Sequence, residues 1–124
     1  MSSAELTFSV TDDDTAIAVG SGSLRVLGTP RLLAWAEAAT CAAVEAELPA
    51  GSTSVGTQVA LEHVAASAVG EQVRVTATVV HREGRQLGLE VIAVDSADQV
   101  VGRGEIARVV VDGERFMARL AHPE

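Results

Sequence analysis

The sequence of 124 residues contains few aromatic residues, no lysine and one cysteine. Aromatic residues make up 2% of the chain and hydrophobic residues 48%, so the core has to be built from aliphatic side chains. All nine basic residues are arginines, and 17 acidic residues give a formal net charge of −8. Because this charge repels a phosphate backbone, we expect no nucleic-acid partner.

Several targeting and cofactor signals are also missing. The lone Cys41 cannot form an intrachain disulfide, which fits a reducing compartment. The first ten residues lack the basic and apolar regions of a signal peptide, and no apolar run approaches the roughly 18 residues of a membrane span. No phosphate-binding loop, serine-hydrolase elbow, zinc-binding helix or paired cysteine motif occurs. We expect a cytoplasmic protein with no membrane association, no metal and no cofactor.

The aspartate run at 12–14 lacks the spaced ligands of a calcium loop, so we expect a solvated turn there. One long helix is predicted over 29–48, with Thr29 as the N-cap, Pro30 at the first helical position and Pro49 after its end. Period-two alternation and turn residues predict the strands. The stretches with strand character are 4–10, 15–27, 53–67, 71–82, 86–95 and 98–111.

One long helix and a run of antiparallel strands predict an α+β domain spanning 1–124. The pattern fits a hotdog fold, in which an antiparallel sheet wraps around one long central helix. A cone-shaped α+β fold is the alternative, but several helices usually precede its sheet. A short helical turn is expected over 114–120. A sheet wrapped on one helix leaves an exposed edge strand, so we expect a homodimer with a continuous sheet.

Two residues of the predicted helix are candidates for chemistry. Successive residues about 100° apart place Glu37 between Leu33 and Cys41, on the most apolar arc of a helix expected to be buried nearly all round. An acid buried there is suited to act as a base, an acid or a nucleophile, whereas the structural alternative is an edge acid paired with an arginine. The hydroxyl of Thr29 either caps the helix or orients a substrate or carboxylate at the positive helix end.

Three strand residues are further candidates. His63 shares a face with the aliphatic residues of its strand and is expected to face the helix, either as a hydrogen-bonded core histidine or as a catalytic one. Gly56 opens that strand and either offers its N–H to an oxyanion or marks a bulge. Arg108 lies in phase with the aliphatic Ile106, so it must pair with an acid or bind an anion.

The spacing of Thr29, Glu37, Gly56 and His63, with Arg108 near the end of the last strand, resembles the fluoroacetyl-CoA thioesterase family of hotdog enzymes. The resemblance implies an acyl-CoA thioesterase whose catalytic residues are Thr29, Glu37 and His63. It also implies that the Gly56 amide meets the thioester and that Arg108 belongs to the same site. The similar segments, between about Gly28 and Phe116, are TPRLLAWAEAATCAA, VGTQVALEHVAAS, REGRQL and GRGEIARVVVDGERF.

The sequence departs from the family pattern at two points. In the fluoroacetyl-specific enzyme, aromatic side chains before the helix gate the acyl pocket, whereas residues 11–28 contain none. Pro30 also stands where the family has a glycine after the threonine. These departures predict weak selectivity for fluoroacetyl groups.

We therefore expect hydrolysis of a small acyl-CoA thioester to the free acid and CoA. An alternative of another class is a hotdog module that binds an acyl-CoA or a small hydrophobic ligand without turning it over. In that case Glu37 and His63 are polar anchors in an apolar pocket. A hydratase or dehydratase has less support, because nothing here resembles the Asp-His segment of those enzymes.

Overall fold

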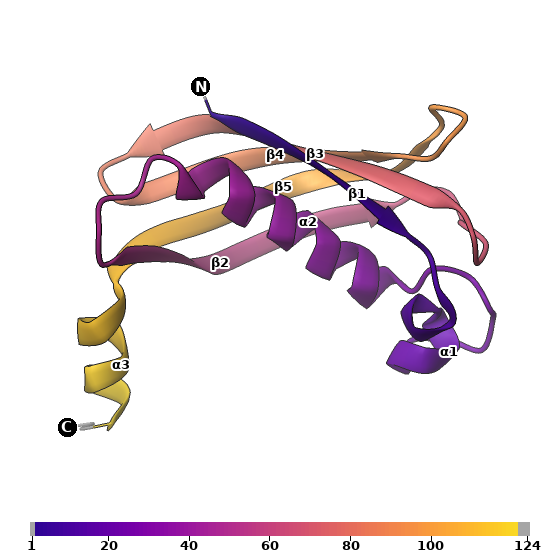
Figure 1. The fold of residues 1–124 in the computed structure, drawn as a ribbon, viewed down its shortest axis with the longest axis horizontal. Coiled ribbons are helices and arrows are strands. Elements are labelled where there is room, and N and C mark those ends of the chain that lie inside the picture. The colour runs from indigo at the N-terminus through magenta and orange to yellow at the C-terminus, as the bar shows by residue number, and fades with distance from the viewer. Residues whose placement is uncertain (1, 122–124) are drawn as a thin grey trace.

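The computed structural model describes residues 2–121, in which a five-stranded antiparallel sheet wraps around one long helix (Figure 1). The strand order is β1-β3-β4-β5-β2, so β1 and β2 are the two edges. Among these residues no helix is long and apolar enough to cross a membrane. The elements are β1 (Ser3–Ser9), the 3-10 turn η1 (Asp12–Asp14), α1 (Ala16–Val19), α2 (Thr29–Glu45), β2 (Ser52–His63), β3 (Gln72–Glu83), β4 (Gln86–Val94), β5 (Val100–Asp112) and α3 (Gly113–Ala121).

The core lies between α2 and the sheet and is largely aliphatic, as expected. Alternate residues of β3 from Val73 to Val79 are fully buried, which is the period-two pattern of a strand with one covered face. The helix meets the sheet through small residues such as Ala36 and Ala39, and these let the backbones approach closely. Trp35 is the large exception, and its ring stacks on that of Phe8 with centroids 4.7 Å apart.

The start, the end and the burial of α2 correct three expectations. Gly28, not Thr29, is the N-cap residue, and Thr29 is the first residue of the helix. The hydroxyl of Thr29 is therefore not used for capping. The helix ends at Glu45, earlier than predicted, and it is not buried all round: Cys41 is exposed and 41% of the Glu37 side chain is accessible.

Five of the predicted strands are present within a few residues of their expected bounds, but the strand expected over 15–27 is wrong. The side chain of Thr15 accepts a hydrogen bond from the Ala18 N–H and starts the short α1, which Gly20 ends with a φ of 76°. The helical turn expected near the C-terminus is the nine-residue α3. The aspartate run forms η1, where Asp12 and Asp14 pair with nearby arginines.

A bulge in β2 decides which of its residues face α2. The pairing of β2 with β5 shifts between Gly56 and Gln58, so Thr57 is the extra residue. In a regular strand Gly56 and His63, seven positions apart, would point to opposite faces. The bulge restores both to the face that α2 covers. Gly56, and not Thr57, therefore shares the face of His63.

Candidate active site

The structure brings Thr29 and His63 together. Thr29 lies at the start of α2 and His63 at the end of β2, and their Oγ1 and Nδ1 atoms are 2.8 Å apart. The hydroxyl is available for this contact because Gly28 occupies the N-cap position. Burial lowers the pKa of His63 from its ordinary value of 6.5, and the backbone of Ala65 opposes this effect only in part. The imidazole is therefore neutral at physiological pH.

An open hollow of about 300 Å³ adjoins this pair, between the α1 segment and the end of β2. Its walls are small or aliphatic, without an aromatic side chain. The Nε2 atom of His63 is buried and has no hydrogen-bond partner within the described residues. A buried polar atom without a partner costs free energy, so His63 Nε2 has unused hydrogen-bonding capacity in a residue that lines the hollow. The residues that line the hollow are Ala16, Ser21, Val26, Leu27, Thr29, His63, Val64, Ala65 and Ala66.

Glu37 lies two turns further along α2, against the backbone of β2. A Cβ atom added at Gly56 would come within 2.8 Å of Glu37 Oε2, which is closer than such atoms approach. Glycine at position 56 is therefore what allows the carboxylate to lie over the strand. The family resemblance implied that Glu37 and Gly56 serve one site, but no contact between the two was predicted.

Arg108 is buried, with 5% of the residue exposed, and holds this part of the site together. Its Nη1 atom lies 3.7 Å from Glu37 Oε2, so the guanidinium pairs with the acid. Its Nε donates to Ser54 Oγ at 2.8 Å and its Nη2 to the Ser54 carbonyl at 3.0 Å. Nη1 also donates to Thr40 Oγ1 at 3.4 Å. Because its N–H groups are held by partners on several sides, the guanidinium of Arg108 has a fixed position.

Ser54 and Thr40 are residues that the sequence did not single out. Ser54 precedes Gly56 by two positions and so shares its face of β2. Thr40 is fully buried on α2, one turn after Glu37, and donates its hydroxyl hydrogen to the Glu37 carbonyl at 2.6 Å. A buried guanidinium needs polar partners, and Arg108 was expected to need one. A search for such partners is the signal that could have identified Ser54 and Thr40 from the sequence.

The five predicted site residues therefore form two sets on the covered face of the sheet. Thr29 and His63 form the first, and Glu37, Gly56 and Arg108 the second. Eight residues of helix separate Thr29 from Glu37, which is about 12 Å along the axis. No hydrogen bond or ion pair joins the two sets within residues 2–121. Glu37 and His63, both expected to be catalytic, therefore have no hydrogen bond or ion pair with each other in the described part of one protomer.

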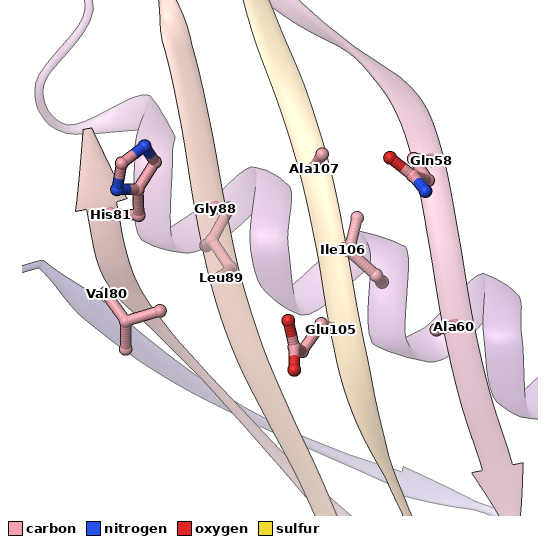
Figure 2. A pocket seen from close by; sticks show the side chains of 9 residues that line it. All are labelled: Gln58, Ala60, Val80, His81, Gly88, Leu89, Glu105, Ile106 and Ala107. Atoms are coloured by element: carbon pink, nitrogen blue, oxygen red, sulfur yellow. The ribbon is translucent and has the colours of Figure 1, made fainter. Parts of the chain in front are cut away.

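A second hollow, of about 320 Å³, lies on the opposite face of the sheet (Figure 2). Its rim carries His81, Glu105 and Gln58, and its floor is formed by small residues such as Gly88. None of the five predicted site residues lines it. The chemistry expected from the sequence therefore belongs to the covered face and not to this hollow.

Known proteins resemble this chain in sequence and in fold. Residues 10–114 match the fluoroacetyl-CoA-specific thioesterase family. A fluoroacetyl-CoA thioesterase of Streptantibioticus cattleyicolor is 35% identical over 95 residues, which are 77% of this chain and 68% of that protein. A mutant of a fluoroacetyl-CoA thioesterase, solved in complex with acetyl-CoA, superposes with a TM-score of 0.89 at 28% identity, covering 96% of this chain and 93% of that one.

A hot-dog-like protein from Thermanaerovibrio acidaminovorans shares the fold, with a TM-score of 0.86 at 24% identity over 95% of this chain and 87% of that one. The predicted hotdog fold is therefore confirmed. The chain belongs to the fluoroacetyl-CoA-specific thioesterase family, and it is a thioester hydrolase with a hotdog fold.

Proposed function

We propose that this protein hydrolyses small acyl-CoA thioesters at the covered face of its sheet. Water supplies the hydroxyl that ends on the acyl carbon, the carbon–sulfur bond breaks, and the proton ends on the departing CoA sulfur. The observation that carries the proposal is the Thr29–His63 contact beside an open hollow, with His63 Nε2 left without a partner. The complex of a relative with acetyl-CoA supports this substrate class.

Each of the five residues has a proposed role. Glu37 is the nucleophile or the base that activates water, and Arg108 keeps its carboxylate charged and in place. Thr29 orients the imidazole by donating to Nδ1, which places the ring proton on Nε2, and His63 transfers that proton. The N–H of Gly56 stabilises the oxyanion that forms on the thioester carbonyl.

The protein acts as a homodimer in this proposal. Residues 56–60 of β2 are all exposed in one protomer, which leaves the backbone of an edge strand uncovered. A second copy related by a two-fold axis would pair its own β2 antiparallel to this one and continue the sheet. Light scattering at micromolar concentration should give at least twice 12.8 kDa. A mass of one chain would exclude this arrangement.

The proposed location is the cytoplasm. Cys41 is an exposed free thiol, which persists best in a reducing compartment.

The direct test is release of free thiol from a panel of short, branched and aromatic acyl-CoAs. Folded protein that turns over none of them would contradict the proposal. A module that only binds acyl-CoA is the remaining alternative, and it would show tight binding in calorimetry with the thioester intact after hours. The Glu37→Gln variant, assayed beside the wild type, separates these two outcomes because it removes the charge and leaves the shape of the side chain.

A further inference from the structure

The helix α3 has an apolar face that nothing in one protomer covers. Figure 1 shows it leaving the end of β5 and pointing away from the sheet and α2. None of its residues is buried, and Met117 and Leu120 are 61% and 63% exposed. Phe116 lies on the same side of the helix, because residues three and four apart are neighbours on a helix surface. Such a stripe marks a surface that meets another molecule.

The orientation of α3 is set at its first turn. The Gly113 N–H donates to the Gly51 carbonyl at 3.1 Å, and the Arg115 N–H donates to Asp112 Oδ1 at 3.0 Å. Asp112 pairs with Ser52, the first residue of the edge strand β2. The helix therefore begins at the corner of the sheet next to the edge where a second copy is proposed to pair.

The antiparallel pairing of two β2 strands determines what lies beside that corner. With the two-fold axis at the middle of β2, Ser52 is opposite the partner's His63, because these are the first and last residues of the strand. The end of β5 is then two strand spacings, about 10 Å, from the partner's β2. A helix of nine residues is about 14 Å long, so α3 can reach across this distance.

The partner's hollow has the features that such a helix would cover. Its lining is mostly small and aliphatic, and Val64 at its edge is 47% exposed. One charge also matches: α3 carries Arg115 and Arg119, and η1 beside the hollow includes the exposed Asp13, whereas Asp12 and Asp14 already pair with Arg25 and Arg31. The Gly28 N–H donates to the Asp14 carbonyl, which keeps η1 next to the start of α2.

We propose that Phe116 and Leu120 of each protomer form an apolar wall over the Thr29–His63 hollow of its partner, and that the acyl chain of the substrate lies between them. This inference rests on the proposed function and on the β2 pairing. The wall supplies in trans the apolar cover that residues 11–28, which lack aromatics, do not supply in cis. The ligand of this surface is the aliphatic part of an acyl-CoA longer than acetyl.

The first experiment measures kcat/KM for a series from acetyl-CoA to hexanoyl-CoA. Wild type should gain about fourfold per added methylene. The double variant Phe116→Ala/Leu120→Ala should lose most of this gain, whereas Glu114→Gln, on the polar side of the same helix, should keep it. Equal chain-length dependence in all three proteins would overturn the wall, and no turnover by wild type would instead overturn the proposed function.

The second experiment asks whether the wall comes from the partner. A heterodimer carrying two different affinity tags is purified from a His63→Ala chain and a Phe116→Ala/Leu120→Ala chain. Its intact histidine lies on the chain with the altered helix. A wall in trans predicts the wild-type chain-length dependence for this heterodimer, because the His63→Ala chain supplies a normal α3. The dependence of the double variant would show that α3 acts within its own chain, and this result would overturn the inference.

Discussion

At the scale of single residues, the start of α2 shows how the choice of N-cap residue leaves the Thr29 hydroxyl free to contact His63. Threonine before proline is a common helix start, and its hydroxyl would then accept a hydrogen bond from the helix backbone. Here Gly28 takes the N-cap position and Thr29 reaches His63 instead. The cost is small, because glycine at the N-cap in place of a capping side chain costs only about a few tenths of a kcal/mol. The Thr29 hydroxyl is therefore free for the role that we propose for it, which is to orient the imidazole of His63.

The carboxylate of Glu37 is expected to act in the reaction in addition to pairing with Arg108. Glu37→Gln should lower kcat by at least about hundredfold and leave KM within a few-fold, because the amide keeps the shape but can neither attack nor accept the proton. Thiol release under saturating acyl-CoA measures this. Glu45→Gln, an exposed acid two turns along the same helix, is the matched control and should be unaffected. A similar loss in both variants would point to general damage to α2.

The pH dependence follows from the lowered pKa of His63. A neutral imidazole is favoured in the folded protein, so the reaction should persist below pH 6.5 and fall only as the ring becomes protonated at lower pH. The free energy of unfolding should fall over the same acid range, because the unfolded chain binds that proton more readily. A kcat/KM profile and denaturant titrations test both. The control variant His81→Gln should show the same loss of activity at low pH. A loss of activity that begins above pH 6.5 would be incompatible with the assignment of this titration to His63.

At the scale of elements, the bulge in β2 is what joins strand and helix into a site. It turns both Gly56 and His63 toward α2, and Gly56 leaves room for the carboxylate of Glu37. Gly56→Ala should therefore displace that carboxylate and lower kcat by about tenfold or more. Gly88→Ala, where the added Cβ meets His81 at 3.3 Å on the other face of the sheet, is the matched control. Activity assays measure the loss of catalysis, and melting temperatures show whether either substitution destabilises the fold. Equal activity in both variants would argue against a close fit at position 56.

The elements also show what a sequence of this kind predicts. Strict alternation in residues 71–82 and 86–95 predicted β3 and β4 closely, because one covered face requires a period of two. The stretch 15–27 alternates as well, yet Thr15 caps a short helix and Gly20 ends it, so local hydrogen bonding prevailed over the pattern. The bulge at Thr57 gave no signal beyond a glycine in a strand. All five candidate residues were named from sequence, but their division into two sets depends on tertiary distances that spacing does not contain.

At the scale of the whole molecule, that division has a consequence for assembly. Thr29 and His63 lie at one end of β2, and Glu37, Gly56 and Arg108 lie nearer its middle. An antiparallel pair of β2 strands would bring each end of one strand beside the opposite end of the other. The exposed side of α2, with Cys41 and part of Glu37, would then face the second copy. A dimer would thus cover the side of α2 that is exposed in one protomer.

The size of the acyl group is the last property that the whole arrangement predicts. Aromatic side chains each cover about 150 to 250 Å², and within one protomer none lies in residues 11–28 and no Phe, Tyr or Trp lines the hollow beside His63. A hollow of about 300 Å³ is larger than an acetyl group requires. We therefore expect little preference for fluoroacetyl-CoA over acetyl-CoA, and higher kcat/KM for butyryl-CoA than for either, because each buried methylene contributes about 0.8 kcal/mol. Competition assays with paired substrates measure these ratios directly. Activity that falls steeply after acetyl, with fluoroacetyl strongly preferred, would mean that a side chain outside residues 11–28 fills the hollow and leaves room for two carbons only.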